Sequence, residues 1–357
     1  MIGFLIVAYT FLSAVRTFVM PRSSREWLSS VTFRCVLLVF RLRMRKVTTY
    51  EERDRMMAMY APLSLLTLPA VWLVSILVGY MFMFWAIGPR PVYDVLSISG
   101  SSLFTLGFTK SEGVMSLFLE FSEAALGLTM IALLIAYLPT MYSAFSKREA
   151  MVSLLEVRAG IPPSALDLLT RANRIQGLDA LTELWEDWEV WFAEVSESHT
   201  SLAALIFFRS PLPDLSWITA AGVILDTAAL LASTIDTPNN PQAQLMIRAG
   251  YVALRRIGDY FEIDYDPDPQ PEDFISISQQ EYDTIYDQLV ARGLPVKADR
   301  EKAWRDFRGW RVNYDRVLLA LAALTMAPYA QWVSDRSLPR GTMFRRRGRN
   351  GNGNEKK

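Results

Sequence analysis

Three long apolar runs constrain the fold of this chain more than any other feature. They cover residues 2–20, 62–87 and 114–145, and each contains few charged side chains. A helix rises about 1.5 Å per residue, so about 20 apolar residues cross a hydrocarbon core roughly 30 Å thick. Backbone groups in lipid need partners within the segment, which selects helices. We therefore expect three membrane-spanning helices, the first of them a retained anchor (residues 1–21) and not a cleaved signal peptide.

The overall composition indicates a membrane part joined to a soluble part. Hydrophobic residues make up 51% of the chain, which is high for a soluble protein and low for one embedded throughout. Lys plus Arg and Asp plus Glu are equal at 37 each, so the net charge indicates no nucleic-acid partner. The single cysteine, Cys35, excludes an intrachain disulfide, and the single histidine, His199, argues against a zinc site. No metal cofactor is expected.

The uneven placement of basic residues predicts the orientation in the membrane. Connection 88–113 carries only Arg90 and Lys110. The connection between the first two apolar runs is far more basic and carries Arg22, Arg25, Arg34, Arg41, Arg43, Arg45, Lys46, Arg53 and Arg55. Cytoplasmic loops are enriched in such residues. We expect a multi-pass protein of the cell membrane, with the N-terminus outside and a cytoplasmic domain at residues 147–335.

Segment 22–60 is expected to contain an amphipathic helix. Basic and apolar side chains occupy different faces at spacings of three and four: Arg34, Arg41 and Arg45 on one, Trp27, Leu28, Val31, Leu38 and Leu42 on the other. This helix either lies on the inner leaflet, where it would bind anionic lipid, or packs against the cytoplasmic domain. The tail at 336–357 is also basic; we expect it to be disordered and to contact anionic lipid.

A short segment between the second and third apolar runs carries the most distinctive motif. Residues 91–104 begin with a proline suited to a helix start, but they are too few to span a bilayer. Such a segment must be re-entrant, with its non-helical end buried in protein or lining water. The residues that follow are Thr105, Leu106, Gly107, Phe108 and Thr109. Threonine can offer hydroxyl and carbonyl oxygens to an ion, and glycine permits unusual backbone angles.

Residues 62–145 resemble the potassium-channel superfamily, in particular bacterial channels with two pore-forming helices flanking one pore loop. The core of the resemblance is TLGFT, which stands where the family has TVGYG. It implies a pore domain at residues 61–146, passive conduction of potassium or other monovalent cations, and a selectivity filter at residues 105–109. Because the family closes its pore with four copies, it also implies a homotetramer. No enzymatic activity is expected.

The sequence departs from the family pattern on the outer side of the motif. Thr109 stands where the family has a second glycine, and a β-branched residue is strained at positive φ. Lys110 replaces an acidic residue, with Glu112 two positions later. Glu120 and Glu123 lie near the outer end of the third apolar run; they either shape the field around the pore mouth or hydrogen-bond the pore loop. The departures leave two alternatives open: a non-selective cation channel, or a non-conducting membrane sensor or scaffold.

Positions that weaken the spanning helices are candidate hinges. Pro69 and Pro139 each remove a backbone donor, so both helices are expected to bend there. Gly127 lies in the middle of the third span, where it permits either flexing or the close approach of another helix. Gly127 and Pro139 are therefore candidates for a gate in the pore-lining helix.

The pattern of residues 147–335 predicts an all-α domain. Gly160, Pro162 and Pro163 separate two helices, and Ser278 with Glu281 forms a capping box. A helix at 178–198 has an apolar stripe formed by Trp185, Trp188, Phe192 and Val195, with acidic residues on its other faces. Apolar stretches 217–232 and 317–333 are expected to be buried core helices. Asp264, Asp266 and Asp268 imitate an EF-hand, but Pro269 stands where glycine is needed, so calcium binding is not expected.

Overall fold

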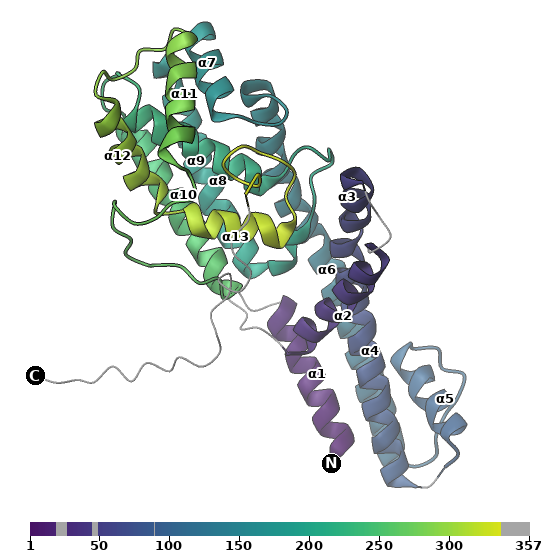
Figure 1. Ribbon diagram of the computed structural model, residues 1–357. Helices are drawn as coiled ribbons and strands as arrows, with labels where there is room; N and C mark the ends of the chain where they lie inside the picture. Colours follow the sequence, from purple (N-terminus) through teal and green to yellow (C-terminus); the bar gives the residue numbers. More distant parts are fainter. Residues whose placement is uncertain (19–26, 45–48, 89, 337–357) are drawn as a thin grey trace, which may run out of the picture. The chain divides into compact units, whose positions relative to one another are not determined.

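The computed structural model describes residues 1–18, 27–44, 49–88 and 90–336 (Figure 1). The expectations for Arg22, Arg25, Arg45, Lys46 and the basic tail at 337–357 lie outside these residues. Within the described residues the protein is all-helical, as the sequence predicts, and its only β-type pairing is one isolated bridge between Ile235 and Val296.

The chain forms two compact units, which are described separately. The first consists of Met1–Ser146 and Ser201–Arg209, and the second of Lys147–Thr200 and the residues from Ser210 onward. Residues 147–335 are expected to form one domain. In the structure, Ser201–Arg209 instead groups with the first unit, and Leu205 is buried in a cluster with Leu65 and Met141.

The first unit contains the long apolar helices. Its elements are α1 (Ile2–Phe18), α2 (Trp27–Met44), α3 (Tyr50–Ala58), α4 (Tyr60–Ile87), α5 (Val92–Leu103), the first part of α6 (Val114–Ala159) and the 3-10 helix η2 (Ala203–Phe207). Segment Glu52–Ile87, which includes α4, and α6 are long and apolar enough to cross a membrane. α1 is apolar but has 17 residues, so its crossing remains a prediction.

Two glycines bring α1 and α4 into close contact. A Cβ atom on Gly3 would lie 2.3 Å from the Gly79 carbonyl oxygen, so only glycine fits at this crossing. The face of α4 below it buries Trp72 and Ile76, and the Phe18 ring packs edge-on against Trp72 with ring centroids 4.9 Å apart. Small residues that let backbones approach are the usual basis of helix packing in apolar surroundings.

The second unit is a helical domain arranged around α9 (Trp217–Ser233). Its other elements are the end of α6, α7 (Ala165–Ile175), η1 (Leu178–Ala180), α8 (Leu181–Ser201), α10 (Pro241–Tyr260), α11 (Gln279–Ala291), α12 (Arg300–Arg311) and α13 (Asp315–Thr325). Helices α7, α10, α12 and α13 pack on α9, which is buried along nearly its whole length. The prediction of a buried core helix at 217–232 is confirmed.

The predicted details of the second unit are confirmed with two corrections. The aromatic stripe of α8 is buried, and so is Trp191, which the predicted stripe omits. The capping box of Ser278 and Glu281 forms at the start of α11. Stretch 317–333 is not one helix, because α13 ends where Met326 adopts a left-handed conformation with φ 50°. The residues after it still bury Trp332 and Val333.

Candidate functional site

The segment between α5 and α6 is the candidate functional site. Pro91 is the N-cap of α5, which has 12 residues and ends at Leu103. At about 1.5 Å per residue, a helix of this length covers little more than half of a hydrocarbon core. The loop of residues 104–113 follows, and α6 then begins at Val114. The predicted short helix and non-helical motif are thus present between the two membrane-length helices.

Ser101, in the last turn of α5, gathers the amides of the loop. Its carbonyl oxygen accepts hydrogen bonds from the N–H groups of Leu106 at 2.8 Å and Gly107 at 3.5 Å. Its hydroxyl oxygen accepts from the N–H groups of Phe108 at 3.1 Å and Thr109 at 3.3 Å. Ser101 itself is 1% exposed. Four consecutive amides of the loop therefore point toward one buried residue.

The direction of these amides determines the direction of the carbonyls. In a planar trans peptide the C=O of one residue is antiparallel to the N–H of the next. Because the amides of residues 106–109 face Ser101, the carbonyls of residues 105–108 point away from it. In the described part of the chain, no protein donor binds the carbonyl oxygens of these four residues. The result is a row of unpaired carbonyl oxygens, which we call the oxygen row.

The backbone angles of the loop correct one expectation. Thr105 has φ 55° and Gly107 has φ 69°, so left-handed residues alternate with the other members of the motif. The expected strain at Thr109 is wrong, because Thr109 does not adopt a positive φ. The strained β-branched residue is Thr105. Such outliers persist only where surrounding contacts over-determine the conformation, and they are concentrated at functional sites.

The side chains of the motif are exposed within the single chain. Leu106 is 63% exposed and Phe108 is 67% exposed. Phe108 borders an open hollow of about 520 Å³, together with Tyr93, Ser97 and Lys110. The Phe108 side chain is therefore not packed into the core of a single copy.

Two buried or half-buried carboxylates attach the loop and α5 to α6. Glu120 accepts hydrogen bonds from both the backbone N–H of Ser111, at 2.7 Å, and its hydroxyl, at 2.5 Å. Glu123 is fully buried, and its Oε1 accepts from the hydroxyl of Ser99 in α5 at 2.5 Å. Glu120 therefore hydrogen-bonds the loop, as one of the two expectations had it, whereas Glu123 binds α5 and not the loop. An effect of either carboxylate on the field at the pore mouth remains a prediction. Lys110 and Glu112 are exposed on the loop.

At Gly127, α6 packs closely against the end of α5. A Cβ atom there would lie 2.1 Å from the carbonyl oxygen of Leu103, at the end of α5. Of the two possibilities raised for this glycine, close packing is the one observed. α6 continues without interruption through Pro139, as α4 does through Pro69. A hinge at Gly127 or Pro139 remains a prediction.

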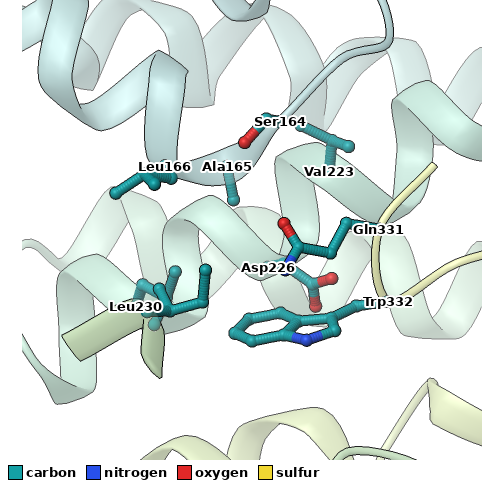
Figure 2. Close-up of a pocket in the computed structure, with 9 residues that line it drawn as sticks. Ser164, Ala165, Leu166, Val223, Asp226, Leu230, Gln331 and Trp332 are labelled. Atoms are coloured by element: carbon teal, nitrogen blue, oxygen red, sulfur yellow. The ribbon is translucent and has the colours of Figure 1, made fainter. Parts of the chain in front are cut away.

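A second polar cluster lies in the second unit and has a structural character. Arg311 is fully buried and binds both oxygens of Asp226, the carboxylate of Asp315 and the carbonyl of Trp332. Figure 2 shows Asp226 beside Gln331 and the Trp332 ring, at a cavity of about 10 Å³. That volume is about the space of one water molecule. Every charge in the cluster is paired, so it is suited to holding the core together rather than to binding a ligand.

No group of three or more potential metal-ligating His, Cys, Asp or Glu residues occurs among the residues that the structure describes. Asp264 of the rejected EF-hand pairs with Arg316, and Asp266 accepts the amide of Asp268. No protein-family model, curated protein or solved structure matches this chain.

Sequence reasoning identified the motif but missed the residues that position it. Ser99, Ser101 and Ser111 carry the hydrogen bonds that hold the loop, and none was singled out in advance. For Ser99 and Ser101 a signal was available, because four of the twelve residues of α5 are serines. Buried hydroxyls need partners, and in this helix the partners are the loop and α6.

Proposed function

We propose that the protein is a homotetrameric cation channel in which Thr105–Thr109 forms the selectivity filter. The observation that carries this proposal is the oxygen row. Unpaired carbonyls are costly in an apolar environment unless water or an ion satisfies them. Consecutive carbonyls on one side of a chain replace the hydration shell of a cation, which is how channel filters conduct. The short helix and loop between two membrane-length helices supply the surroundings such a filter needs.

The oligomeric state follows from the one-sidedness of the site. A single chain presents the oxygen row on one side only, so an ion needs further copies to complete its coordination. Rotational symmetry brings identical rows around one axis, and the family resemblance implies four. The exposed Phe108 and the hollow beside it support the same proposal, because a neighbouring copy would cover them.

In the proposed topology α1, α4 and α6 cross the cell membrane and α5 is re-entrant. The N-terminus lies outside, and the second unit is cytoplasmic, where it gates the pore or aids assembly. The exposed side chains of α2 support contact with anionic lipid of the inner leaflet. Trp27 is 66% exposed, Leu38 58% and Leu42 51%, and Arg34 and Arg41 are also exposed. The expected separation of basic and apolar side chains on different faces is therefore wrong, because both kinds share the exposed side of α2.

Potassium is the ion that the resemblance favours, and two features bear on selectivity. Lys110 is exposed next to the motif, where a cation repels entering cations. Thr109 replaces a glycine of the family, although its backbone is unstrained. A non-selective cation channel is therefore the nearest alternative. A tetramer that conducts nothing would instead indicate a membrane sensor or scaffold built on a channel frame.

Ion flux through purified protein in liposomes tests the proposal. Potassium, sodium and a large organic cation are compared for the unaltered chain and for Gly107→Ala. An alanine at φ 69° is strained by about 1–2 kcal/mol, and its strain falls within the oxygen row. We expect Gly107→Ala to assemble but not to conduct. Gly113→Ala is the matched control, because Gly113 also has a positive φ, 97°, and lies outside the motif. Normal flux through Gly107→Ala would overturn the pore assignment.

A further inference from the structure

Residues Ser201–Arg209 interrupt the second unit in the sequence but pack with the first. We call this segment the clamp. It contains the 3-10 helix η2 and carries no charged side chain before Arg209. Ala204 and Leu205 are buried, Leu205 completely. Because the burial of apolar side chains is the main favourable term in folding, these contacts hold the clamp on the first unit.

The clamp contacts both membrane-length helices, on either side of the candidate hinge in α6. Leu205 packs in one buried cluster with Leu65 of α4. The same cluster contains Tyr137 and Met141 of α6, which precede and follow Pro139. A bend of α6 at the proline moves Met141 relative to Leu65. The buried cluster therefore opposes such a bend.

Two aromatic contacts extend the clamp along the same two helices. The Phe207 ring packs edge-on against Tyr60 of α4, with ring centroids 5.5 Å apart. The Phe208 ring packs against Phe145 of α6 at 5.7 Å. Aromatic pairs at such distances add to the free energy gained by burial alone. The part of α6 that follows the proline is thus joined to α4 through the clamp.

An ion pair holds the end of the clamp on α3. Arg209 Nη1 donates a hydrogen bond to Asp54 Oδ1 at 2.5 Å. The two side chains are only 12% and 10% exposed. Salt screens such a pair little, and the loss of one partner from a buried pair is strongly destabilising.

We propose that the clamp is an autoinhibitory contact, which restrains α6 at Pro139 and so opposes opening of the pore. Helices that line a pore move relative to their neighbours when it opens, and the clamp joins α6 to one such neighbour, α4. Both ends of the clamp continue into the second unit: α8 leads into it and Ser210 follows it. A conformational change in that unit that displaces either end releases α6. The autoinhibitory role rests on the proposed function, whereas the restraint on α6 does not.

Two substitutions loosen the clamp in different ways. Leu205→Ala leaves a cavity in the buried cluster, and Arg209→Met removes the cation that pairs with Asp54. Arg209→Lys keeps that cation and is the conservative variant. Leu289→Ala is the matched control for Leu205→Ala, because Leu289 of α11 in the second unit is also completely buried.

Hydrogen exchange of the full chain in detergent measures the restraint on α6 without requiring ion flow. The exchange of residues 140–146, after the proline, is divided by that of residues 114–125 in the same helix. In Leu205→Ala and Arg209→Met this ratio should rise by about tenfold or more. In Arg209→Lys and Leu289→Ala it should stay close to that of the unaltered chain. An unchanged ratio in either clamp variant that folds, or an equal rise in Leu289→Ala, would overturn the clamp.

Ion flux in liposomes then separates the clamp from the channel proposal. In a chain that conducts, Leu205→Ala and Arg209→Met should raise potassium flux by about fivefold or more, while Leu289→Ala should not. Flux that is unchanged or lower in the clamp variants would refute the autoinhibitory role and leave the channel standing. If neither the unaltered chain nor the clamp variants conduct while exchange rises at 140–146, the channel is refuted and the restraint on α6 stands.

Discussion

Replacing Ser101 by alanine should disorder the outer half of the oxygen row while leaving its inner half in place. The hydroxyl of Ser101 accepts the amides of Phe108 and Thr109, which belong to the same peptide planes as the carbonyls of Gly107 and Phe108. The backbone carbonyl of Ser101, which survives the substitution, continues to accept the amides of Leu106 and Gly107. The carbonyls of Thr105 and Leu106 therefore keep their orientation.

The size of the effect follows mainly from the two lost hydrogen bonds to amides; the longer bond that the hydroxyl donates to the Thr109 carbonyl, at 3.5 Å, is lost as well. Each is worth about 0.5–1.5 kcal/mol net, so the loss of both disfavours the observed loop by about 1–3 kcal/mol. A coupling of that size changes the relative population of two conformations by about 5–150-fold. We expect reduced potassium conductance and weaker discrimination between potassium and sodium. The assembled tetramer should persist, because Ser101 lies within a single copy's contact between α5 and its own loop.

Two measurements check this reasoning. Hydrogen exchange at the Phe108 and Thr109 amides should accelerate in Ser101→Ala whether or not the protein conducts, and flux in liposomes reports the functional consequence. Ser102→Ala is the matched control, since Ser102 is also buried but its hydroxyl binds none of these amides. Unchanged exchange at both amides in Ser101→Ala would refute the role assigned to its hydroxyl.

Three further predictions concern packing and charge. Gly127→Ala should force α6 away from α5 and destabilise the protein by about 1–3 kcal/mol. Gly100→Ala should not, because its new Cβ would meet its nearest neighbour at 3.9 Å. Equal melting temperatures of the two variants would contradict this. Arg311→Met leaves buried carboxylates unpaired and should lower the free energy of unfolding, measured with a chemical denaturant, by about 3–5 kcal/mol. The same change at exposed Arg316 should lower it by less than about 1 kcal/mol. Similar losses in the two variants would show that burial is not decisive. Burial and the charge of Arg148 hold the pKa of His199 well below 6.5 in the folded unit. As the pH falls, the unfolded chain therefore binds a proton at His199 before the folded unit does. Stability should therefore fall as the pH drops below 6.5, by up to about 1.4 kcal/mol per pH unit, and His199→Gln should remove that part of the slope; an unchanged slope would show that another group titrates.

Local pattern was enough to predict the helical class and several of the elements. The apolar run around α4, the proline that begins α5 and the capping box of Ser278 with Glu281 each act within a few residues of chain. Helix formation and capping depend on such neighbours, which is why these features can be read in advance. Burial of α9 was predictable for a related reason, because a short and largely apolar helix has to be covered.

At the candidate site, local pattern was not enough to predict the backbone conformation. The motif at residues 105–109 was visible in the sequence, but the strain was assigned to Thr109 and found at Thr105. Backbone angles in a loop depend on where its amides find partners, and here one buried serine in the preceding helix supplies them. The close packing at Gly127 likewise depends on a distant contact, because the carbonyl of Leu103 approaches it from α5.

Contacts between distant parts of the chain could not be predicted from the sequence. Arg311 binds Asp226, which lies 85 residues earlier in the sequence. Ser201–Arg209 belongs to the first unit, although the residues on both sides of it belong to the second. A charged residue in a sequence is expected at the surface unless a partner is known, and the partner is known only when the helices are packed. The sequence by itself determined which segments are helical and apolar, because those properties are local. The tertiary structure alone decided which polar groups meet, because hydrogen bonds and ion pairs depend on atoms that only folding brings within 3 Å or so of one another.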